Sequence, residues 1–530
     1  MINETDMAAL RMQLADRLRR RKPGGNKAVA AGEEPRPRSV LVCGAGGCAS
    51  GGGRQLYAAL RDELLRRGLA GQVELVPTGC LGLCAEGPVL AIAPEGVVYS
   101  RVGVADVWEI VEDHLLAGKP VERLLAGYIA PEEGLYSAET RRITARWGII
   151  NPERLEEAVA AGSYRALAAA VLRKESVELV RLAGEFLPGF GPADGVVATL
   201  NEPAPGVYLR STLAESDPHS LLEGLALAAI AVNAPLAVLH VPAEYTLAAE
   251  RLRLALRAAV EAGFLGDGLF GGEASLRVEL CVGEEDFLQK DDSALLEALG
   301  GRRAAPAPAD PIDPAASGCG VLGGLRVRIA SPESLVRLAF AASSRLAAAE
   351  EPSAEEETVL LALSGRLLRP RLCEASASMT LRELIEQMGG GLPEGDELQA
   401  VQFGGPTGGL LRPDQLEVPL NAAGLRAWRE GMGAPVLTAI GGDESLLDAL
   451  RSVYRYLGRH SCGQCSVCRI GLARVEERLG AAGEEPDAEA VRQLAELGKQ
   501  LREASRCGFG RSAARPLLTY LAHFCGVEVE

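Results

Sequence analysis

The stretch SVLVCGAGGC, residues 39–48, decides how the N-terminal part of the chain folds. Its apolar run Val40–Cys43 predicts a short buried strand, and the glycine-rich loop after it carries a second cysteine. The same order recurs in VELVPTGCLGLC, residues 73–84, where a strand runs into a loop with two more cysteines. Around these segments the pattern predicts an α/β domain with its own core, built from helices over 54–67 and 107–117 and strands over 89–92 and 97–102.

Strands and helices alternate in the next part of the chain. This order is typical of a parallel sheet with crossover helices. The predicted strands cover 196–200, 236–241 and 276–282, and the predicted helices between them cover 220–232 and 247–262.

Two further patterns complete the chain. Residues 359–411 predict a strand pair, a glycine-rich turn and a helix over 381–388 with Thr380 as its N-cap, in the manner of a β-grasp module. Residues 444–524 predict helices throughout. We therefore expect a multidomain α/β protein of 530 residues with a C-terminal helical bundle.

The charge balance excludes some classes of partner. The chain has 55 basic and 71 acidic residues, a net charge of −16, which argues against nucleic acid or an anionic membrane surface as the main partner. The most apolar stretch, residues 221–241, is interrupted by Asn233 and Pro235, so we expect no membrane span. Residues 1–21 lack the apolar core of a signal peptide, which favours a cytoplasmic protein.

Cysteine is the residue type most able to bind metal in this chain. There are twelve cysteines but only five scattered histidines. In a reducing compartment, cysteines more often serve as metal ligands or catalytic groups than as disulfides. Four of the twelve are isolated: Cys281, expected in the core, and Cys319, Cys373 and Cys525, expected to be inert thiols.

The C-terminal group lies in SCGQCSVCR, residues 461–469. Cys462, Cys465 and Cys468 follow one another at three-residue intervals, and Cys507 comes later in SRCGFG. Three thiolates on one turn can hold three corners of an iron–sulfur cube, and a remote fourth can complete it. Structural zinc normally uses two separate pairs, and four buried thiols without metal are a further alternative. The spacing favours a 4Fe–4S cluster.

The N-terminal group consists of two pairs in two loops, Cys43 with Cys48 and Cys80 with Cys84. Loops after the strands of an α/β sheet are where such folds present their ligands. The spacing within each pair is longer than in most zinc sites, which favours a 2Fe–2S cluster. Zinc and metal-free thiols stay open on spacing alone.

These motifs resemble a known family. VCGAGGC and PTGCLGLCAEGP resemble the thioredoxin-like 2Fe–2S ferredoxin domain, and SCGQCSVCR with CGFG resembles the 4Fe–4S domain of the NADH-binding flavoprotein subunit of respiratory complex I. NAD-linked hydrogenase and formate dehydrogenase β subunits share that domain. SDPHSLLEGLALAAIAV, residues 216–232, and the stretch 361–409 resemble the family's DPH segment and its soluble-ligand-binding (SLBB-like) β-grasp module.

The resemblance implies a domain order. It comprises an N-terminal helix and linker (1–38), a thioredoxin-like 2Fe–2S ferredoxin domain (39–125), a Rossmann-like FMN/NADH-type α/β domain (126–350), an SLBB-like β-grasp module (351–440) and a helical 4Fe–4S domain (441–530).

The family's chemistry is implied in the same way. NADH gives a hydride to FMN, the flavin passes single electrons to the 4Fe–4S cluster, and other redox subunits are the partners. The positions that match the family's cofactor-facing motifs are Glu202, Gly206, Gly283, Glu284 and Glu285.

The chain departs from the family at the flavin. The family's glycine-rich phosphate cradle has only a faint counterpart within residues 175–200, in Gly189 and Gly191. The acidic NADH loop is reduced to NEPAPGVYLR, residues 201–210, and the family's asparagine pair falls on Ala330 and Ser331. An insertion, residues 286–292, follows the retained Gly-Glu-Glu. We therefore infer that FMN and NADH binding are weakened or lost.

Three hypotheses follow, and they differ on whether the chain is itself an enzyme. The first is an iron–sulfur electron-transfer subunit of an NADH-dehydrogenase-like or hydrogenase-like complex. The second is a catalytic NADH:acceptor oxidoreductase that retains FMN. The third is a non-catalytic scaffold whose clusters serve stability. No catalytic triad can be assigned from the sequence.

Overall fold

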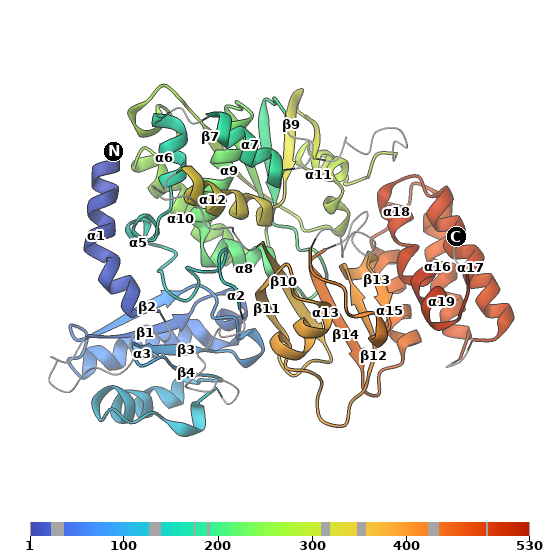
Figure 1. Cartoon of the computed structure of the whole chain (residues 1–530), viewed down its shortest axis with the longest axis horizontal. Helices are drawn as coiled ribbons and strands as arrows, with labels where there is room; N and C mark the ends of the chain where they lie inside the picture. The colour runs from blue at the N-terminus through green and yellow to red at the C-terminus, as the bar shows by residue number, and fades with distance from the viewer. Residues whose placement is uncertain are drawn as a thin grey trace. The chain divides into compact units, whose positions relative to one another are not determined.

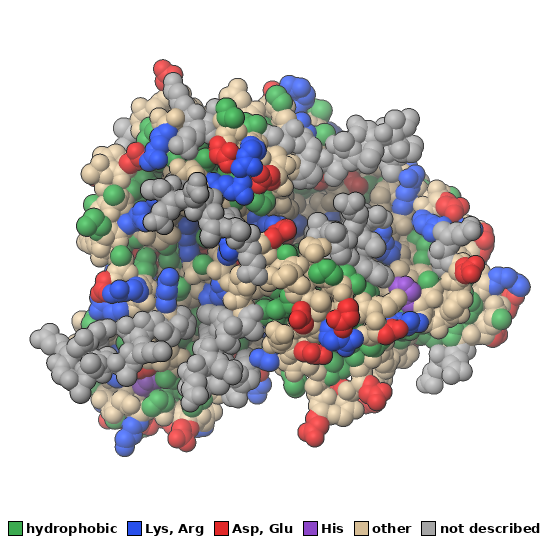
Figure 2. Space-filling view, in the orientation of Figure 1, with side chains coloured by type: hydrophobic (Ala, Val, Ile, Leu, Met, Phe, Trp, Pro, Cys, Tyr) green, Lys and Arg blue, Asp and Glu red, His purple; other side chains and the backbone are tan. Residues whose placement is uncertain are grey.

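The computed structural model divides the chain into two compact units. The first contains Met1–Leu200, Arg210–Val282 and Ala330–Ser353, and the second contains Asn201–Leu209, Gly283–Ile329 and Ala354–Glu530 (Figure 1). The structure describes residues 2–22, 37–126, 139–173, 176–187, 191–308, 318–346, 357–421, 434–483 and 486–528. Within these ranges, none of the helices combines the length and hydrophobicity needed to cross a lipid bilayer. Acidic and basic side chains are intermixed over the face seen in Figure 2.

The first unit begins with α1 (Glu4–Arg20), which packs on α5 (Leu155–Ala160) (Figure 1). Asn3 and Asp6 form a capping box that satisfies the first amides of α1. Arg21, directly after the helix, is completely buried and donates hydrogen bonds to Glu157 (2.6 Å) and to the carbonyl of Ile149 (2.9 Å). Because an ion buried this deeply needs such partners, they fix the end of α1.

A four-stranded sheet follows, with strand order β2-β1-β3-β4. Strand β1 (Arg38–Cys43) pairs parallel with β2 (Val73–Thr78) and antiparallel with β3 (Leu90–Ala93), and β4 (Val97–Tyr99) pairs antiparallel with β3. Helix α3 (Arg54–Arg66) and the helical segment α4–η4 (Val107–Leu116) contribute apolar side chains to its core. The strands and helices predicted from the sequence are all present.

Three further strands of the first unit lie side by side in the order β7-β6-β5. Strands β5 (Gly195–Thr199) and β6 (Leu236–Pro242) are parallel, as predicted, and β7 (Arg277–Gly283) lies beside β6. The helices of this part are α6 (Arg165–Leu172), α7 (Ser176–Phe186), α8 (Leu209–Ser216), α9 (Pro218–Ala231), α10 (Thr246–Glu261) and α12 (Pro332–Leu346).

Helix α9 lies at the centre of this part, and its residues from Pro218 to Ala229 are all buried. Asp217 caps the helix by accepting a hydrogen bond from the Ser220 amide. At Gly224 a Cβ atom would collide with the carbonyl oxygen of Leu335, so α9 and α12 approach each other where only glycine fits.

The second unit contains a mixed sheet with the order β11-β10-β14-β12-β13. Its strands are β10 (Thr358–Gly365), β11 (Arg371–Ser376), β12 (Leu398–Phe403), β13 (Gly409–Leu411) and β14 (Val436–Gly441). The predicted helix begins with α13 (Leu381–Glu383) and continues to Met388, and Thr380 caps it by accepting a hydrogen bond from the Glu383 amide.

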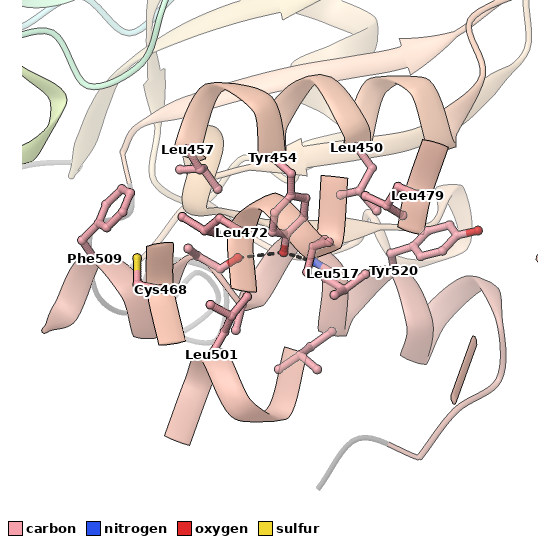
Figure 3. Close-up of a cluster of buried hydrophobic side chains, with 14 of the residues drawn as sticks. Leu450, Tyr454, Leu457, Cys468, Leu472, Leu479, Leu501, Phe509, Leu517 and Tyr520 are labelled. Atoms are coloured by element: carbon pink, nitrogen blue, oxygen red, sulfur yellow. Dashed lines mark hydrogen bonds between the residues drawn. The ribbon is translucent and has the colours of Figure 1, made fainter. Parts of the chain in front are cut away.

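The C-terminal residues form the predicted helical bundle, drawn in orange to red in Figure 1. It consists of α15 (Leu446–Arg459), α16 (Ser466–Ala481), α17 (Ala488–Ala504), α18 (Gly508–Ser512) and α19 (Arg515–Phe524). Tyr454 lies in the middle of its core, donates a hydrogen bond to the carbonyl of Ala513 (2.7 Å) and accepts one from the Leu517 amide (3.2 Å) (Figure 3).

Smaller elements of the second unit are η7 (Phe287–Lys290), α11 (Asp292–Leu299) and the hairpin of β8 (Cys319–Leu322) and β9 (Leu325–Ala330). One sequence prediction is wrong: Cys281 is not in the core but partly exposed, because β7 has no fully buried residue. Most of the predicted linker, residues 23–36, lies outside the described residues.

Candidate metal centres

The four N-terminal cysteines come together at the ends of two adjacent parallel strands. Cys43 ends β1, Cys48 ends the short helix α2 (Gly46–Cys48), and Cys80 and Cys84 follow β2. The Cys80 and Cys84 sulfurs are 3.5 Å apart, and Cys43 shares side-chain hydrogen bonds with Cys48 and Cys80. Cys43, Cys48 and Cys80 are buried, whereas Cys84 is exposed.

Backbone amides point at these sulfurs. The Gly82 amide donates to the Cys80 sulfur at 3.2 Å. Amides of Ala45 and Leu81 donate to Cys43, and the amide of Val89 donates to Cys48. Such N–H groups stabilise negative charge on sulfur, as an iron–sulfur cluster requires of its ligands.

The close approach of the thiols sets their acidity. Hydrogen bonds from Cys48 and Cys80 lower the pKa of the Cys43 thiol well below its usual value. Hydrogen bonds to Cys43 and Cys84, together with burial, raise the pKa of Cys80 well above it. One thiolate therefore forms readily and opposes the ionisation of its neighbour, so the full set needs bound cations to be charged together.

Three of the four C-terminal cysteines lie at or near helix N-termini. Cys465 is the residue before α16, Cys468 lies in the first turn of α16, and Cys507 is the residue before α18. Amides of Gly510 and Phe509 donate to the Cys507 sulfur, and the Ser461 hydroxyl lies 3.5 Å from the Cys468 sulfur. The unpaired amides and the dipole of a helix start favour thiolate at such positions.

Burial makes these thiols hard to ionise without metal. Burial raises the pKa of Cys468 to about 12, and the nearby Cys465, Cys507 and Cys462 add to the rise. Burial also raises the pKa of Cys507, again with Cys462 close by. Cys468 lies beside Phe509 at one end of the bundle core (Figure 3). Four converging thiols in an apolar wall with aimed amides fit an iron–sulfur cluster.

Glycine is required beside this site. Gly463, between the first two cysteines, has φ +75°, a conformation that favours glycine. At Gly510 a Cβ atom would lie 2.6 Å from the Cβ of Ser505 and 3.3 Å from that of Cys468. The CGFG motif thus contains a glycine that keeps α18 close to Cys468, a role that the sequence did not reveal.

Neither thiol group is arranged around one ion. Within the described ranges, no three side chains of His, Cys, Asp or Glu take the arrangement that a single metal ion would need.

The residues matched to the family's cofactor positions lie in two segments of the second unit, Asn201–Leu209 and Gly283–Ile329. Glu202 is buried, and its carboxylate accepts a hydrogen bond from the Leu209 amide at 3.0 Å. The Glu202 amide donates to the Glu285 carboxylate at 3.2 Å. Glu284 and Glu285 are exposed, Gly283 is partly exposed, and exposed Gly206 has φ +73°. The structure therefore brings Glu202 and Glu285 together, with the Glu202 carboxylate turned to its own loop.

The insertion after Gly-Glu-Glu packs into the helical bundle. Phe287 is buried and contacts Tyr456 and Phe509, with ring centroids 5.3 and 6.2 Å apart. Gln289 accepts a hydrogen bond from the Asn201 amide group at 2.6 Å, and Lys290 donates one to the carbonyl of Pro203 at 2.9 Å. The polar groups of this segment are thus bonded to protein.

Ser331, which replaces an asparagine of the family, acts as a helix cap. Its hydroxyl accepts a hydrogen bond from the Ser334 amide at 3.1 Å, at the start of α12. Gly189 lies outside the described residues, so the position of the expected phosphate cradle is described only in part.

Comparisons with known proteins identify relatives of this chain. The profile described as the NADH-ubiquinone oxidoreductase-F iron-sulfur binding region matches residues 448–527, and that of the Nuo51 FMN-binding domain matches residues 191–324. The F 2 subunit of the NADH-quinone oxidoreductase of Rhizobium meliloti is 30% identical over 392 residues, which cover 69% of this chain and 91% of that protein.

Two further proteins are similar to this chain. The HndC subunit of the NADP-reducing hydrogenase of Solidesulfovibrio fructosivorans is 28% identical over 408 residues, 73% of this chain and 82% of that protein. A chain in the crystal structure of air-oxidised NAD+-reducing [NiFe]-hydrogenase matches with a TM-score of 0.57 and 20% identity, over 99% of this chain and 90% of that one. The last match shows a shared mixed α/β multidomain fold.

Proposed function

Because the chain belongs to the family of NADH-quinone oxidoreductase F subunits, as its cysteine motifs predicted, we propose that it is an iron–sulfur electron-transfer subunit of a multisubunit oxidoreductase. Its partners are then other redox subunits of that complex. The relatives support this, since their names describe them as subunits of a quinone oxidoreductase and of a hydrogenase.

The observation that carries the proposal is the surroundings of the eight cysteines. We assign a 2Fe–2S cluster to Cys43, Cys48, Cys80 and Cys84, and a 4Fe–4S cluster to Cys462, Cys465, Cys468 and Cys507. Bound clusters of these types transfer single electrons. The chain supplies the ligands, aims amides at the sulfurs and keeps three of the first set and two of the second away from water.

The fold supports the proposed domain order. The sheet β2-β1-β3-β4 with helices α3 and α4–η4 suits a thioredoxin-like domain over 39–125, and the mixed sheet with α13 suits a β-grasp module over 351–440. The α/β part over 126–350 and the bundle over 441–530 complete the assignment.

We also propose that the nucleotide site has degenerated. The Glu202 carboxylate, Gln289 and Lys290 bond to protein groups, and Ser331 caps α12. The match to the FMN-binding profile begins only at residue 191, after most of the segment where the family carries its phosphate cradle. A phosphate without such a cradle is an uncompensated charge, which costs several kcal/mol in a partly buried site.

A second candidate, a catalytic NADH:acceptor oxidoreductase, is favoured by the same profile match over residues 191–324. Anaerobic reconstitution separates the two. Iron, acid-labile sulfide and released flavin are measured together with the low-temperature EPR spectrum and the visible spectrum after addition of NADH. Both cluster signals without flavin are the expected result.

The other outcomes each favour another function. Stoichiometric flavin that NADH bleaches would establish the catalytic function and end the claim of degeneration. Clusters that no physiological donor reduces would indicate a scaffold. A colourless chain without iron would remove the basis of the proposal.

A further inference from the structure

Both cysteine loops of the N-terminal site are bonded to two consecutive residues at the end of α8. The Gly46 amide, between Cys43 and Cys48, donates a hydrogen bond to the Glu215 carboxylate at 2.6 Å. The Cys80 amide donates one to the Ser216 hydroxyl at 2.9 Å. One helix end therefore holds both loops, although they come from different strands and lie far from α8 in the sequence.

The contact is close in both loops, and in the second loop it requires glycine. A Cβ atom at Gly79 would lie 2.6 Å from the Cβ of Ser216, and one at Gly46 would lie 3.1 Å from a carboxylate oxygen of Glu215. At Gly44 a Cβ atom would lie 2.8 Å from a guanidinium nitrogen of Arg251 on α10. A larger side chain at Gly79 would meet the Cβ and backbone of Ser216 and push its loop away from α8, whereas at Gly44 and Gly46 the ends of the Arg251 and Glu215 side chains would have to shift.

The charges at this contact are unevenly paired. The Glu215 side chain is only 4% exposed. Arg251, also buried, donates to the backbone carbonyl of Glu215 (2.6 Å) and to the carboxylate of Glu153 (3.2 Å). Burial, with a smaller contribution from Cys43, raises the pKa of Glu215 to about 7, although the Gly46 amide, Arg251 and Arg54 oppose the rise. At alkaline pH a buried carboxylate thus lies beside the cysteine site.

We propose that Glu215 and Ser216 are positioning residues of the N-terminal centre: they fix its two ligand loops relative to each other and place a carboxylate where it makes reduction of the centre harder. This inference rests on the proposed function, in which the four cysteines hold a 2Fe–2S cluster. Two loops that share a cluster must keep a fixed spacing, and a single rigid helix end provides it. Reduction adds one negative charge, which a nearby carboxylate disfavours through a low-dielectric interior.

The first test separates charge from shape. Glu215→Gln keeps an oxygen that accepts the Gly46 hydrogen bond but removes the charge. Glu250→Gln removes the same charge from an exposed position on α10, next to Arg251, and serves as the matched control. Both holoproteins are titrated anaerobically at pH 8.5, above the pKa of Glu215, and the reduced 2Fe–2S centre is followed by EPR.

At the wild-type midpoint, we expect the ratio of reduced to oxidised centre to rise about tenfold in Glu215→Gln, a shift of about 59 mV for one electron. Glu250→Gln should leave the ratio unchanged. Equal potentials in the wild type and Glu215→Gln, with both centres fully loaded, would overturn the electrostatic role while leaving the proposed function intact.

The second test does not need the cluster. Hydrogen–deuterium exchange of the full chain is measured for Glu215→Ala, Ser216→Ala and Glu250→Gln. Loss of one hydrogen bond to a charged acceptor should speed exchange about tenfold at Gly46 in Glu215→Ala. Ser216→Ala should speed exchange at Cys80, and Glu250→Gln should change neither loop. Unchanged exchange at both loops would overturn the positioning role, and this holds even if the wild type binds no cluster.

Discussion

The two cysteine sites meet the same chemical need in different ways. The N-terminal site presents its sulfurs on loops after β1 and β2, and it depends on side chains of α8 that are remote in sequence. The C-terminal site presents three of its sulfurs at or near the starts of α16 and α18, inside the core of its own bundle. Both aim amides at sulfur, but the ligand loops of the first are hydrogen-bonded to α8, whereas the second lies in a bundle core that Phe287 also enters.

The difference shows what each site tolerates. The stability of a site built on helix N-termini depends on the packing of its bundle. The stability of a site built on glycine-rich loops depends on the side chains that hydrogen-bond to those loops. Substitutions that distinguish these supports should therefore affect one centre and spare the other.

The largest effect is expected for Cys465→Ser. Serine oxygen is a poor ligand for iron in a site shaped for thiolate, so the 4Fe–4S EPR signal should vanish or nearly vanish. The 2Fe–2S signal should persist, and bound iron should fall to what that centre alone contains. The reciprocal Cys80→Ser should give the opposite pattern. Loss of both signals in either variant would show that the two sites are not independent.

A smaller effect is expected for Arg21→Met. This change leaves the Glu157 carboxylate, 2% exposed, without its closest cation. Removing one partner of a buried ion pair typically costs about 3–5 kcal/mol. Arg21 also bonds Glu74 on β2, the strand that leads to Cys80, so loading of the 2Fe–2S centre should fall while 4Fe–4S loading stays normal. Thermal unfolding and EPR measure the two effects, with the exposed Arg61→Met as the control.

Tyr454→Phe tests the C-terminal support. The lost hydroxyl leaves the Ala513 carbonyl and the Leu517 amide without their buried partner, at a cost of about 1–3 kcal/mol. The melting temperature of the bundle should drop and 4Fe–4S loading should weaken. Unchanged 2Fe–2S loading is the result that the comparison requires, since Tyr454 belongs to the bundle alone.

The smallest effect is expected on thermal stability at acidic pH. Although burial alone would raise it, hydrogen bonds from Arg17 and Arg21 lower the pKa of Glu74 to about 2, from an ordinary 4.5. A carboxylate with a lowered pKa stabilises the fold above pH 4.5, and this contribution is lost as the pH falls from about 4.5 to 2. The gap in melting temperature between the wild type and Glu74→Gln should therefore be full at pH 7 and should close in acid. A constant gap would contradict the assignment.

Much of this organisation is readable from local sequence. The three-residue spacing of Cys465 and Cys468 suits the first turn of α16, and Thr380 caps its helix as predicted, because both depend on neighbours in the chain. The parallel pairing of β5 and β6 follows from the alternation of strands and helices between them. The family resemblance is confirmed for the same reason, since its motifs are short and continuous.

Contacts between segments that are distant in the chain could not be predicted from the sequence. Nothing near Glu215 in the sequence points to Gly46, and nothing after Gly283 shows that Phe287 enters the bundle core. Nothing in CGAGGC itself shows that Glu215 of α8 and Arg251 of α10 lie against Gly46 and Gly44. Cys281 was misjudged because alternating apolar residues do not show whether anything covers the strand.

Cys84 is the ligand of the N-terminal centre that solvent reaches most easily. It is the one exposed sulfur among the four, and it lies next to exposed Ala85. The iron held there would be the first to meet dissolved oxygen or a chelator, whereas the iron held by buried cysteines would be shielded. Damage in air should thus begin as loss of a single metal atom from a known side, and the lifetime of the preparation on the bench should depend on how well that side is covered.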